Sequence, residues 1–488
     1  MKRRDFIKDA AIAAAAGAAF STRAAAASPK RPNVLLILVD QMRTPMFTPL
    51  LSTPNIDRIA AEGVSFNRHF VAASVCSPSR ASLITGKHPG GHNIMINCDF
   101  HNGDKQPSLD TSITTMGHVF RNVGYRTPYK GKWHLTLKDD RNKKDPLIDY
   151  GFQDWQPPDA PFGGPPYSGA LQDPVYARQA ARWIKEEGPA GGPWFMVCSL
   201  VNPHDICSYP RYYPQRKLRP IKTEEPPPNW TDDLSGKPGC QREYQEVYDE
   251  IGGKMDLGSG EAWRRYLDYY IHCTEDMDGN VGKVMDALYE SGQLGNTIVV
   301  FTSDHGDMGG SHRLRAKGCF AYDEIMNTPL IFRAPWLLPT GVERDAMASN
   351  VDVLPTLASL AGISMKKEGL AGKDLSPALV DAAAEVRDEV LFSSYSELST
   401  PNDIFKKDPD RIKSPARLRC VRTGDWKYAR YFDPGSDAEE YELYNIKDDP
   451  LEMDNLADDR GYAKVKTEMA GRLYELEEKF TGKEEKDG

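Results

Sequence analysis

The sequence predicts an α/β fold in which helices flank a large, mixed but mostly parallel sheet, followed by a smaller antiparallel sheet and a helix. Three short apolar runs, each followed at once by polar residues, predict central strands that are buried on both faces. Segments with apolar residues at helical spacing separate these runs, and such alternation is typical of a parallel sheet. A Gly-containing turn between two β-rich runs near the C-terminal end predicts the antiparallel sheet.

The predicted central strands cover residues 34–39, 194–201 and 297–303. Polar residues follow each of them: Asp40-Gln41 after the first, Asn202-Pro203-His204-Asp205 after the second and Asp304-His305 after the third. Because the carboxyl ends of parallel strands meet at one edge of a sheet, we expect these side chains to gather there and to form a site.

Helical spacing predicts helices over residues 55–62, 263–289 and 353–361. The character of the sequence changes after about residue 388. Runs at 417–422 and 426–431 flank the turn Thr423-Gly424-Asp425, residues 441–444 add a strand, and an amphipathic helix covers about 462–480. We therefore predict a main α/β domain at 32–388 and a C-terminal subdomain at 389–488.

The first segment of the chain has the features of an export signal. Arg3-Arg4 precedes an Ala-rich run of about 11 residues, too short to span a bilayer, and small residues at 24–27 offer a cleavage site. We predict a twin-arginine signal peptide at 1–27, recognised by the twin-arginine export machinery, and a soluble periplasmic or secreted protein without stable membrane insertion. An amphipathic or disordered N-terminus is the alternative.

Composition excludes several classes of protein. With 40% hydrophobic and 27% charged residues, the 488-residue chain is neither disordered nor fibrous. A net charge of −9 argues against a polycationic nucleic-acid binder, so we expect no nucleic-acid partner. An anion bound by this chain needs a local cluster of basic residues. The eight cysteines are scattered without a C-x-x-C pair, and we expect at most one or two disulfides among them.

The segment around Cys76 can bind an anion. In Cys76-Ser77-Pro78-Ser79-Arg80, the proline suits the first turn of a helix, and Gly86 suits its end. Cys76 then lies at a helix N-terminus, where backbone N–H groups favour negative charge. Arg80 can reach the same anion with its planar fork of donors. A half-buried cysteine before a capped helix is the alternative interpretation.

This segment resembles the signature of the type I sulfatases, Cys-x-Pro-Ser-Arg with a Gly six residues after the Arg, whose cysteine is oxidised to formylglycine (3-oxoalanine). Further segments resemble family motifs in the same order: 33–41, Gly131-Lys132-Trp133-His134, Pro203-His204, Ser303-Asp304-His305-Gly306 with Lys317, and the tail from Glu442 to Glu452. The resemblance covers about residues 32–460. It implies an alkaline phosphatase-like fold and a sulfuric ester hydrolase acting on a sulfate monoester, for which we favour a carbohydrate.

The resemblance also implies a divalent metal. Its ligands would be Asp40, Gln41, the oxidised Cys76, Asp304 and His305. Oxygen ligands suit Ca²⁺, Mg²⁺ or Mn²⁺, whereas an imidazole favours Mn²⁺ or Zn²⁺. The family favours Ca²⁺, and the sequence leaves the other three open. Cys76 would need a formylglycine-generating enzyme or an anaerobic sulfatase-maturating enzyme as a partner.

The mechanism that the resemblance implies begins with hydration of the aldehyde at residue 76. One hydroxyl attacks sulfur, His204 or Lys317 protonates the leaving alcohol, and His134 removes the proton of the second hydroxyl so that sulfate is expelled. Arg80, Lys132 and Lys317 would bind the sulfate. Asp205, His88 and His92 would contact the alcohol part of the substrate, with ordinary loop roles as the alternative for the two histidines.

An irregular stretch at about 208–240 carries aromatic residues that could stack on a substrate or pack onto the domain: Tyr209, Tyr212, Tyr213 and Trp230. Three positions depart from the family pattern, namely Gln41, His305 and Thr136. The first two resemble phosphonate and phosphodiester hydrolases of the same superfamily. The alternatives are therefore a phosphonate monoester or phosphodiester hydrolase, and a non-catalytic sulfoglycan-binding protein in which Cys76 is never oxidised.

Overall fold

The structure is a computed structural model that describes residues 31–98, 108–137, 146–159, 168–211, 223, 225–365, 369–396 and 413–480. The predicted signal peptide at 1–27 and two of the loop aromatics, Tyr212 and Tyr213, lie outside the described residues. Among the helices in the described part of the chain, none is both long enough and apolar enough to cross a bilayer.

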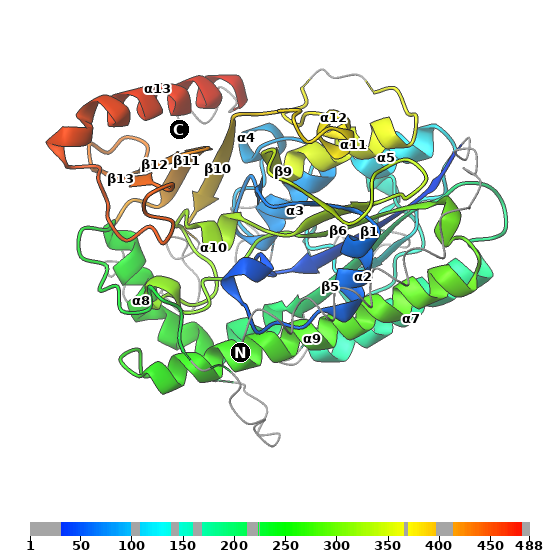
Figure 1. Ribbon diagram of the computed structural model, residues 1–488, viewed down its shortest axis with the longest axis horizontal. Coiled ribbons are helices and arrows are strands. Elements are labelled where there is room, and N and C mark those ends of the chain that lie inside the picture. Colours follow the sequence, from blue (N-terminus) through cyan, green and yellow to red (C-terminus); the bar gives the residue numbers. More distant parts are fainter. Residues whose placement is uncertain are drawn as a thin grey trace, which may run out of the picture.

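A seven-stranded sheet runs through the centre of the molecule, with the strand order β4-β5-β1-β6-β7-β2-β8 (Figure 1). Its strands, in the same order, are Tyr129–Gly131, Phe195–Pro203, Asn33–Asp40, Thr297–Ser303, Leu330–Arg333, Val64–Phe66 and Val342–Arg344. β1 pairs in parallel with both β5 and β6, while β7 is antiparallel to β6 and β2. The predicted mixed, mostly parallel sheet is thus confirmed, as are its three central strands.

Helices cover both faces of this sheet, which explains why every residue of β1, β5 and β6 is buried. Alternate residues of β1 enter opposite cores: Leu36 packs with α3, α5 and α11, whereas Ile37 packs with α2, α7 and α9. Figure 1 shows α7 and α9 on one side and α3, α5 and α11 on the other. An apolar run without alternation is the expected sequence of a strand between two helical layers.

Three helices of the main domain lie where the sequence predicts them. Those at 55–62, 263–289 and 353–361 are confirmed as α2, α9 and α11. The helices are α2 (Pro54–Ala61), α3 (Cys76–Thr85), α4 (Pro89–His92), α5 (Met116–Asn122), α7 (Ser168–Glu186), α8 (Gly239–Gly252), α9 (Gly260–Glu290), α10 (Asp323–Met326), α11 (Val353–Leu360), α12 (Ser376–Val380) and α13 (Ala463–Phe480).

The C-terminal part forms a four-stranded antiparallel sheet with α13 against it (Figure 1). Its strands are β10 (Glu389–Tyr395), β11 (Arg417–Thr423), β12 (Trp426–Phe432) and β13 (Glu439–Asn445). The predicted hairpin is β11–β12, and the predicted terminal helix is α13. One face of this sheet packs on α13 and the other on the core around α8 and α10. The short strands β3 (His69–Phe70) and β9 (Ala348–Ser349) pair separately.

The eight cysteines lie among the described residues, and none of them forms a disulfide. No disulfide therefore contributes to this fold, which is consistent with a chain long enough to bury its own core.

Candidate active site

The predicted strand ends meet. Asp40 is the last residue of β1 and Asp304 follows β6, and the parallel register pairs Val39 with Ser303, so the two carboxylates leave the sheet side by side. Cys76 is the first residue of α3, directly beside them. One ligand atom from each of Asp40, Cys76, Asp304 and His305 lies within 4.8 Å of all the others, and all four residues are buried. We call these four residues the Asp–Cys–Asp–His cluster.

Helix α3 is built to hold Cys76 in place. All ten of its residues are buried between the sheet and α11, so packing fixes its position from every side. Gly86 ends it in the left-handed conformation, with φ of 66°, and its N–H donates to the carbonyl of Ser82. At the other end, the N–H of Ser77 donates to Asn97 Oδ1 at 3.0 Å, and Ser77 Oγ donates to the carbonyl of His134 at 2.6 Å.

Buried cations surround the two carboxylates. Arg80 donates from its NH2 to Asp40 Oδ2 at 2.9 Å and from its Nε to Asp304 Oδ2 at 2.8 Å, while Lys132 Nζ donates to Asp40 Oδ2 at 2.6 Å. The side chains of all four residues have no exposed surface. Burial alone would raise the pKa of Asp40, but Lys132, His204 and Arg80 together hold it well below its usual range.

Asp304 is less well neutralised than Asp40. Burial and the neighbouring charge of Asp40 raise its pKa to about 7, against the opposing effect of Arg80. Two carboxylates held this close repel each other when both are ionised, and a cation bound between them would reduce that repulsion.

His305 presents a neutral nitrogen to the same point. Its Nδ1 lies 2.9 Å from the carbonyl oxygen of Gly306, which can only accept, so Nδ1 carries the proton and Nε2 keeps its lone pair. Nε2 lies 3.3 Å from Cys76 Sγ, 3.8 Å from Asp40 Oδ1 and 3.7 Å from Asp304 Oδ1. Burial lowers the pKa of His305 to about 3, so the ring is neutral. Two carboxylates and a neutral imidazole are the donors of a divalent metal site.

As an unmodified thiol, Cys76 would be unreactive. Burial, and next the charge of Asp40, raise its pKa to about 12, and the thiolate is the nucleophilic form of cysteine. Its Sγ points toward Asp40 Oδ1 at 3.6 Å, inside the group of charged side chains.

Lys317 and His204 extend the site toward a cavity. The pairing of Asp40 with Pro203 in the β1–β5 register places His204 beside the cluster. A cavity of about 210 Å³ is lined by residues from six parts of the chain: Val75, Asn97, His204, Cys207, Tyr244, Tyr248, Ile251, Ala316, Lys317, Gly318, Cys319, Tyr395 and Ser396. The thiol of Cys207, the α8 tyrosines and Tyr395 were not anticipated as site residues.

The amide of Gln41 lies beside the cluster and forms hydrogen bonds with Lys317, Cys207 and Asp307. Its Oε1 accepts from Lys317 Nζ at 2.5 Å and from the thiol of Cys207 at 3.1 Å, while its Nε2 donates to Asp307 Oδ2 at 2.6 Å. The role of Gln41 as a metal ligand stays a prediction, and in this structure its amide oxygen binds Lys317. The cause is its backbone, which turns sharply after β1 with φ of 75°.

His134 and Lys132 occupy the positions that the Gly-Lys-Trp-His motif predicts. Lys132 lies against Asp40, and His134 is buried nearby with φ of 59°. The backbone N–H of His134 donates to the carboxylate of Asp159 at 3.0 Å. Since Ser77 also binds the carbonyl of His134, this segment and the start of α3 are fixed to each other.

Comparison with known proteins identifies the family. The family model described as "Sulfatase" matches residues 32–363. The chain belongs to the sulfatase family. It is therefore a sulfuric ester hydrolase of alkaline phosphatase-like fold. A second model, described as "N-sulphoglucosamine sulphohydrolase, C-terminal", matches residues 310–479 of this sulfatase.

Curated relatives span nearly the whole chain. An uncharacterized sulfatase of Escherichia coli is 28% identical, covering 92% of this chain and 88% of its own. A Delta 4,5-hexuronate-2-O-sulfatase of Bacteroides thetaiotaomicron is also 28% identical, with 92% and 89% covered. Among solved structures, a 2-O GAG sulfatase superposes with a TM-score of 0.75 at 26% identity over 94% of each chain. A phosphonate monoester hydrolase of Agrobacterium radiobacter gives 0.69 at 25% identity, over 92% of this chain and 96% of that one.

Asp205 does not reach the sulfatase cavity, contrary to prediction. Its Oδ1 accepts from the N–H of Gly169 and its Oδ2 from the N–H of Ala170, both at 2.9 Å. The carboxylate therefore holds the first turn of α7. Tyr209 likewise packs on Tyr266 and Tyr269 of α9, which favours the packing role for this loop aromatic. Trp230 packs against the same cluster.

His88 and His92 are also placed differently from the prediction. His88 is 2% exposed, and its ring packs at a tilt of 48° against Phe480 of α13, with 4.9 Å between ring centres. His92 is 1% exposed, and its Nε2 lies 3.0 Å from the hydroxyl of Ser82 in α3. Both histidines are packing residues behind α3 and do not line the mouth of the site.

These two histidines predict acid sensitivity of the fold. Burial lowers the pKa of each to about 3, with a smaller contribution from Arg387 at His88 and from His88 at His92. In the unfolded chain they titrate near 6.5, so below that pH the unfolded state binds protons that the folded state does not, and stability is lost as pH falls from about 6.5 toward 3. The slope of the free energy of unfolding against pH reflects how many more protons the unfolded state binds than the folded state. We expect His88→Gln to lower this number by about one.

Denaturant unfolding at several pH values between 4 and 7 would measure this slope. Equal slopes for the wild type and His88→Gln would show that His88 does not contribute to acid sensitivity.

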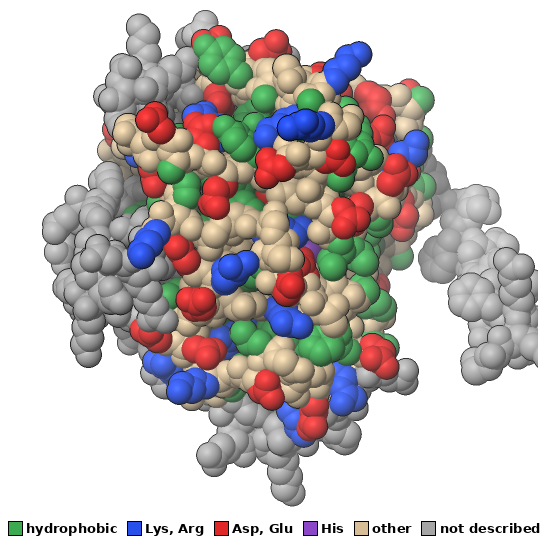
Figure 2. All heavy atoms as spheres, turned by 90° about the vertical axis from the view of Figure 1, so that its left-hand side faces the viewer, with side chains coloured by type: hydrophobic (Ala, Val, Ile, Leu, Met, Phe, Trp, Pro, Cys, Tyr) green, Lys and Arg blue, Asp and Glu red, His purple; other side chains and the backbone are tan. Residues whose placement is uncertain are grey.

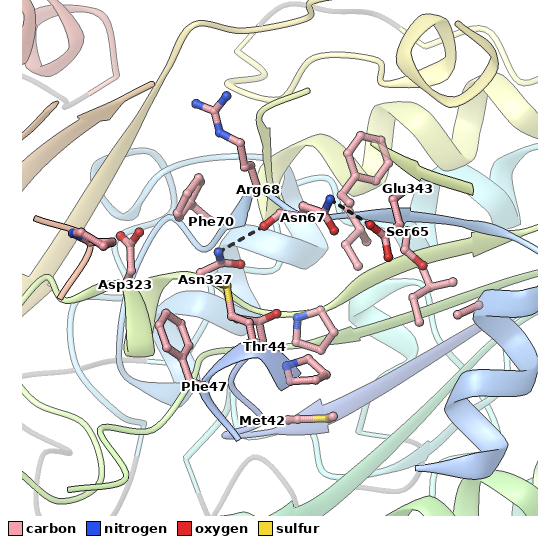
Figure 3. A pocket seen from close by; sticks show the side chains of 18 of the residues that line it. Met42, Thr44, Phe47, Ser65, Asn67, Arg68, Phe70, Asp323, Asn327 and Glu343 are labelled. Carbon is pink, nitrogen blue, oxygen red and sulfur yellow. Dashed lines mark hydrogen bonds between the residues drawn. The ribbon is translucent and has the colours of Figure 1, made fainter. Parts of the chain in front are cut away.

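With a net charge of −9, the protein does not attract anions over a distance. Figure 2 shows acidic and basic side chains interspersed over one face of the molecule. The positive charge that sulfate needs is thus concentrated at the buried site. A separate groove of about 790 Å³ is lined by Met42, Phe47, Arg68, Phe70, Asp323 and other residues (Figure 3). None of the four residues of the Asp–Cys–Asp–His cluster lines it.

Proposed function

We propose that this sulfatase hydrolyses the sulfate monoester of a carbohydrate, with an aldehyde made from Cys76 as its nucleophilic group and a divalent metal beside it. The observation that carries the proposal is the convergence of Asp40, Cys76, Asp304 and His305 within 4.8 Å, surrounded by buried basic residues. The carbohydrate is supported by relatives whose names specify sugars, among them an N-acetylglucosamine-6-O-sulfatase of Bacteroides thetaiotaomicron, 25% identical over 92% of this chain and 87% of its own.

The metal would be held by Asp40, Gln41, Asp304, His305 and the modified residue 76. When bound, a divalent ion supplies positive charge to the sulfate oxygens and favours an ionised hydroxyl. The approach of two buried carboxylates and the neutral nitrogen of His305 to within 4.8 Å of one another supports the presence of a cation. The family favours Ca²⁺ and the imidazole favours Mn²⁺ or Zn²⁺, with Mg²⁺ also compatible. Elemental analysis of the purified protein decides among the four.

The chain's own residues account for binding and proton transfer. Arg80, Lys132 and Lys317 would stabilise negative charge on the sulfate as the ester bond breaks. His204 and Lys317 line the cavity, and one of them would protonate the leaving alcohol there. The neutral state of His134, whose pKa burial and the charge of Lys132 hold well below its usual range, suits a base that removes the proton of the second hydroxyl.

Conversion of Cys76 to an aldehyde would replace an unreactive thiol with a group that can act as a nucleophile once hydrated. A buried thiol with a pKa of about 12 is not a nucleophile, whereas a hydrated aldehyde offers two hydroxyls at the same position. The maturation partner would be a formylglycine-generating or an anaerobic sulfatase-maturating enzyme. Export by the twin-arginine route to the periplasm or beyond is part of the proposal and rests on residues 1–27.

Phosphonate monoester and phosphodiester hydrolysis is the second candidate, supported by the solved phosphonate monoester hydrolase of similar fold and by His305 in the metal cluster. We expect kcat/KM for an aryl sulfate to exceed that for an aryl phosphonate monoester and an aryl phosphodiester by about a hundredfold, since each tenfold preference needs only about 1.4 kcal/mol of differential stabilisation. A reversed order would favour the second candidate. A matured protein that turns over none of the three would favour the non-catalytic sulfoglycan-binding alternative.

A further inference from the structure

The tail from Glu442 to Glu452 belongs to no part of the site described above, yet its two glutamates are buried, at 2% and 1% exposure. We propose that Glu452 and Lys427, both in the C-terminal part, are positioning residues that hold His305 in its metal-binding orientation by way of α10. The inference deepens the proposed function and rests on its metal site.

The first link joins the C-terminal sheet to α10. Lys427, on β12, places its Nζ 2.6 Å from Asp323 Oδ1 and 2.7 Å from Glu452 Oε1, and it also donates to the carbonyl of Ala321 at 2.7 Å. Glu452 Oε2 accepts from the N–H of Asp323 at 2.8 Å. Asp323, the first residue of α10, is thus held through both its side chain and its backbone. We call Lys427, Glu452 and Asp323 the clamp.

The clamp is itself fixed. Glu452 has a left-handed backbone, with φ of 56°, and its carbonyl accepts from Lys237 Nζ at 2.6 Å. Arg422 of β11 donates to Asp323 Oδ2 at 3.2 Å. Figure 3 shows Asp323 beside the groove, at one end of α10. Several charge-assisted bonds therefore converge on one residue, and such bonds are stronger than those between neutral groups.

The second link joins α10 to the turn after β6. The N–H of Gly306 donates to the carbonyl of Ile325 at 2.8 Å, and the N–H of Asp307 donates to the carbonyl of Glu324 at 3.1 Å. The approach is so close that a Cβ on Gly306 would lie 2.0 Å from the Glu324 oxygen. Only glycine fits there, so the turn cannot move closer to α10. The two hydrogen bonds keep it from moving away.

The third link reaches the metal ligand. The carbonyl of Gly306 accepts from His305 Nδ1, and this bond aims Nε2 at Cys76 and the two carboxylates. A ligand imidazole is oriented by the group that binds its other nitrogen, and loss of such groups costs about tenfold to a hundredfold in metal affinity. The chain of contacts thus runs from Lys427 through α10 and Gly306 to His305.

A purely structural interface would also bury these charges, so stability alone cannot test the inference. The experiment uses the full-length matured protein, stripped of metal with a chelator and titrated separately with Mn²⁺ and Ca²⁺. The variants are Lys427→Met, Glu452→Gln and the conservative Lys427→Arg. Arg333→Gln is the control. Arg333, on β7, is a buried cation, 5% exposed, that pairs with Glu62. It lies beside Val299 of β6, away from the end of β6 that Asp304 follows.

We expect Lys427→Met and Glu452→Gln to weaken the affinity for the bound ion about tenfold and to lower kcat for an aryl sulfate with KM little changed. Lys427→Arg should restore most of the affinity. Arg333→Gln should lower the melting temperature and leave the affinity as in the wild type.

Glu452→Gln retains an oxygen for the N–H of Asp323, so it decides the matter if Lys427→Met does not fold. Wild-type affinity in a folded Glu452→Gln or Lys427→Met protein would overturn the positioning role while leaving the proposed function intact. A wild-type protein that binds neither ion would overturn the metal site and this inference together.

Discussion

Replacement of Cys76 by alanine is expected to abolish sulfate ester hydrolysis, with kcat reduced by about 10⁴-fold or more, as for removal of other catalytic nucleophiles. The methyl group fits the buried position and adds no polar atom, so the fold should persist. The carboxylates and Arg80 remain, and the variant should still bind a sulfate-like anion. The activity is measured as the initial rate on an aryl sulfate. Anion binding is measured as the dissociation constant of inorganic sulfate.

Cys198→Ala is the matched control for this variant. Cys198 is as buried as Cys76, but it lies on β5 in the core with α7 and α9, away from the cluster. Its loss should cost stability, on the order of 1–2 kcal/mol, and leave kcat nearly unchanged. Equal activity of Cys76→Ala and the wild type would refute the role of residue 76.

Replacement of Asp40 by asparagine should have the second largest effect. Asp40 accepts from both Arg80 and Lys132 with no exposed surface, so the neutral amide leaves two buried cations poorly compensated. Breaking a buried ion pair from one side costs about 3–5 kcal/mol in stability. A metal ligand is lost at the same time, and we expect kcat/KM to fall about a thousandfold.

Denaturant unfolding and aryl sulfate kinetics measure the two effects of Asp40→Asn. Asp286→Asn is the control, because its pairing with Arg58 lies on the surface, with side chains 59% and 47% exposed, and exposed pairs contribute little. Retention of both stability and metal content in Asp40→Asn would contradict the central position assigned to this carboxylate.

The parts of the site that were predictable are those fixed by strand ends. Asp40 and Asp304 follow continuous apolar runs, and parallel pairing brings such ends together whatever lies between them in sequence. Cys76 was predictable for a similar reason, since Pro78 and Gly86 mark the limits of α3. The short strands β2 and β8, with three residues each, carry too little periodicity to be recognised.

What was not predictable depends on where side chains turn after the strands end. Gln41 points its amide to Lys317 because its backbone is left-handed, and Asp205 turns to α7 because two backbone N–H groups lie within reach. The sequence around either residue shows no sign of this. The contact between Lys427 and Asp323 arises only when the two sheets dock, so no local pattern reveals it.

The most direct test of the account is peptide mass spectrometry on the segment that contains Cys76, taken from protein made in a host with the maturation machinery. We predict a peptide in which residue 76 has lost hydrogen sulfide and gained oxygen, in a fraction of molecules that rises and falls with aryl sulfatase activity. Full activity in a preparation whose residue 76 is entirely unmodified cysteine would contradict the account.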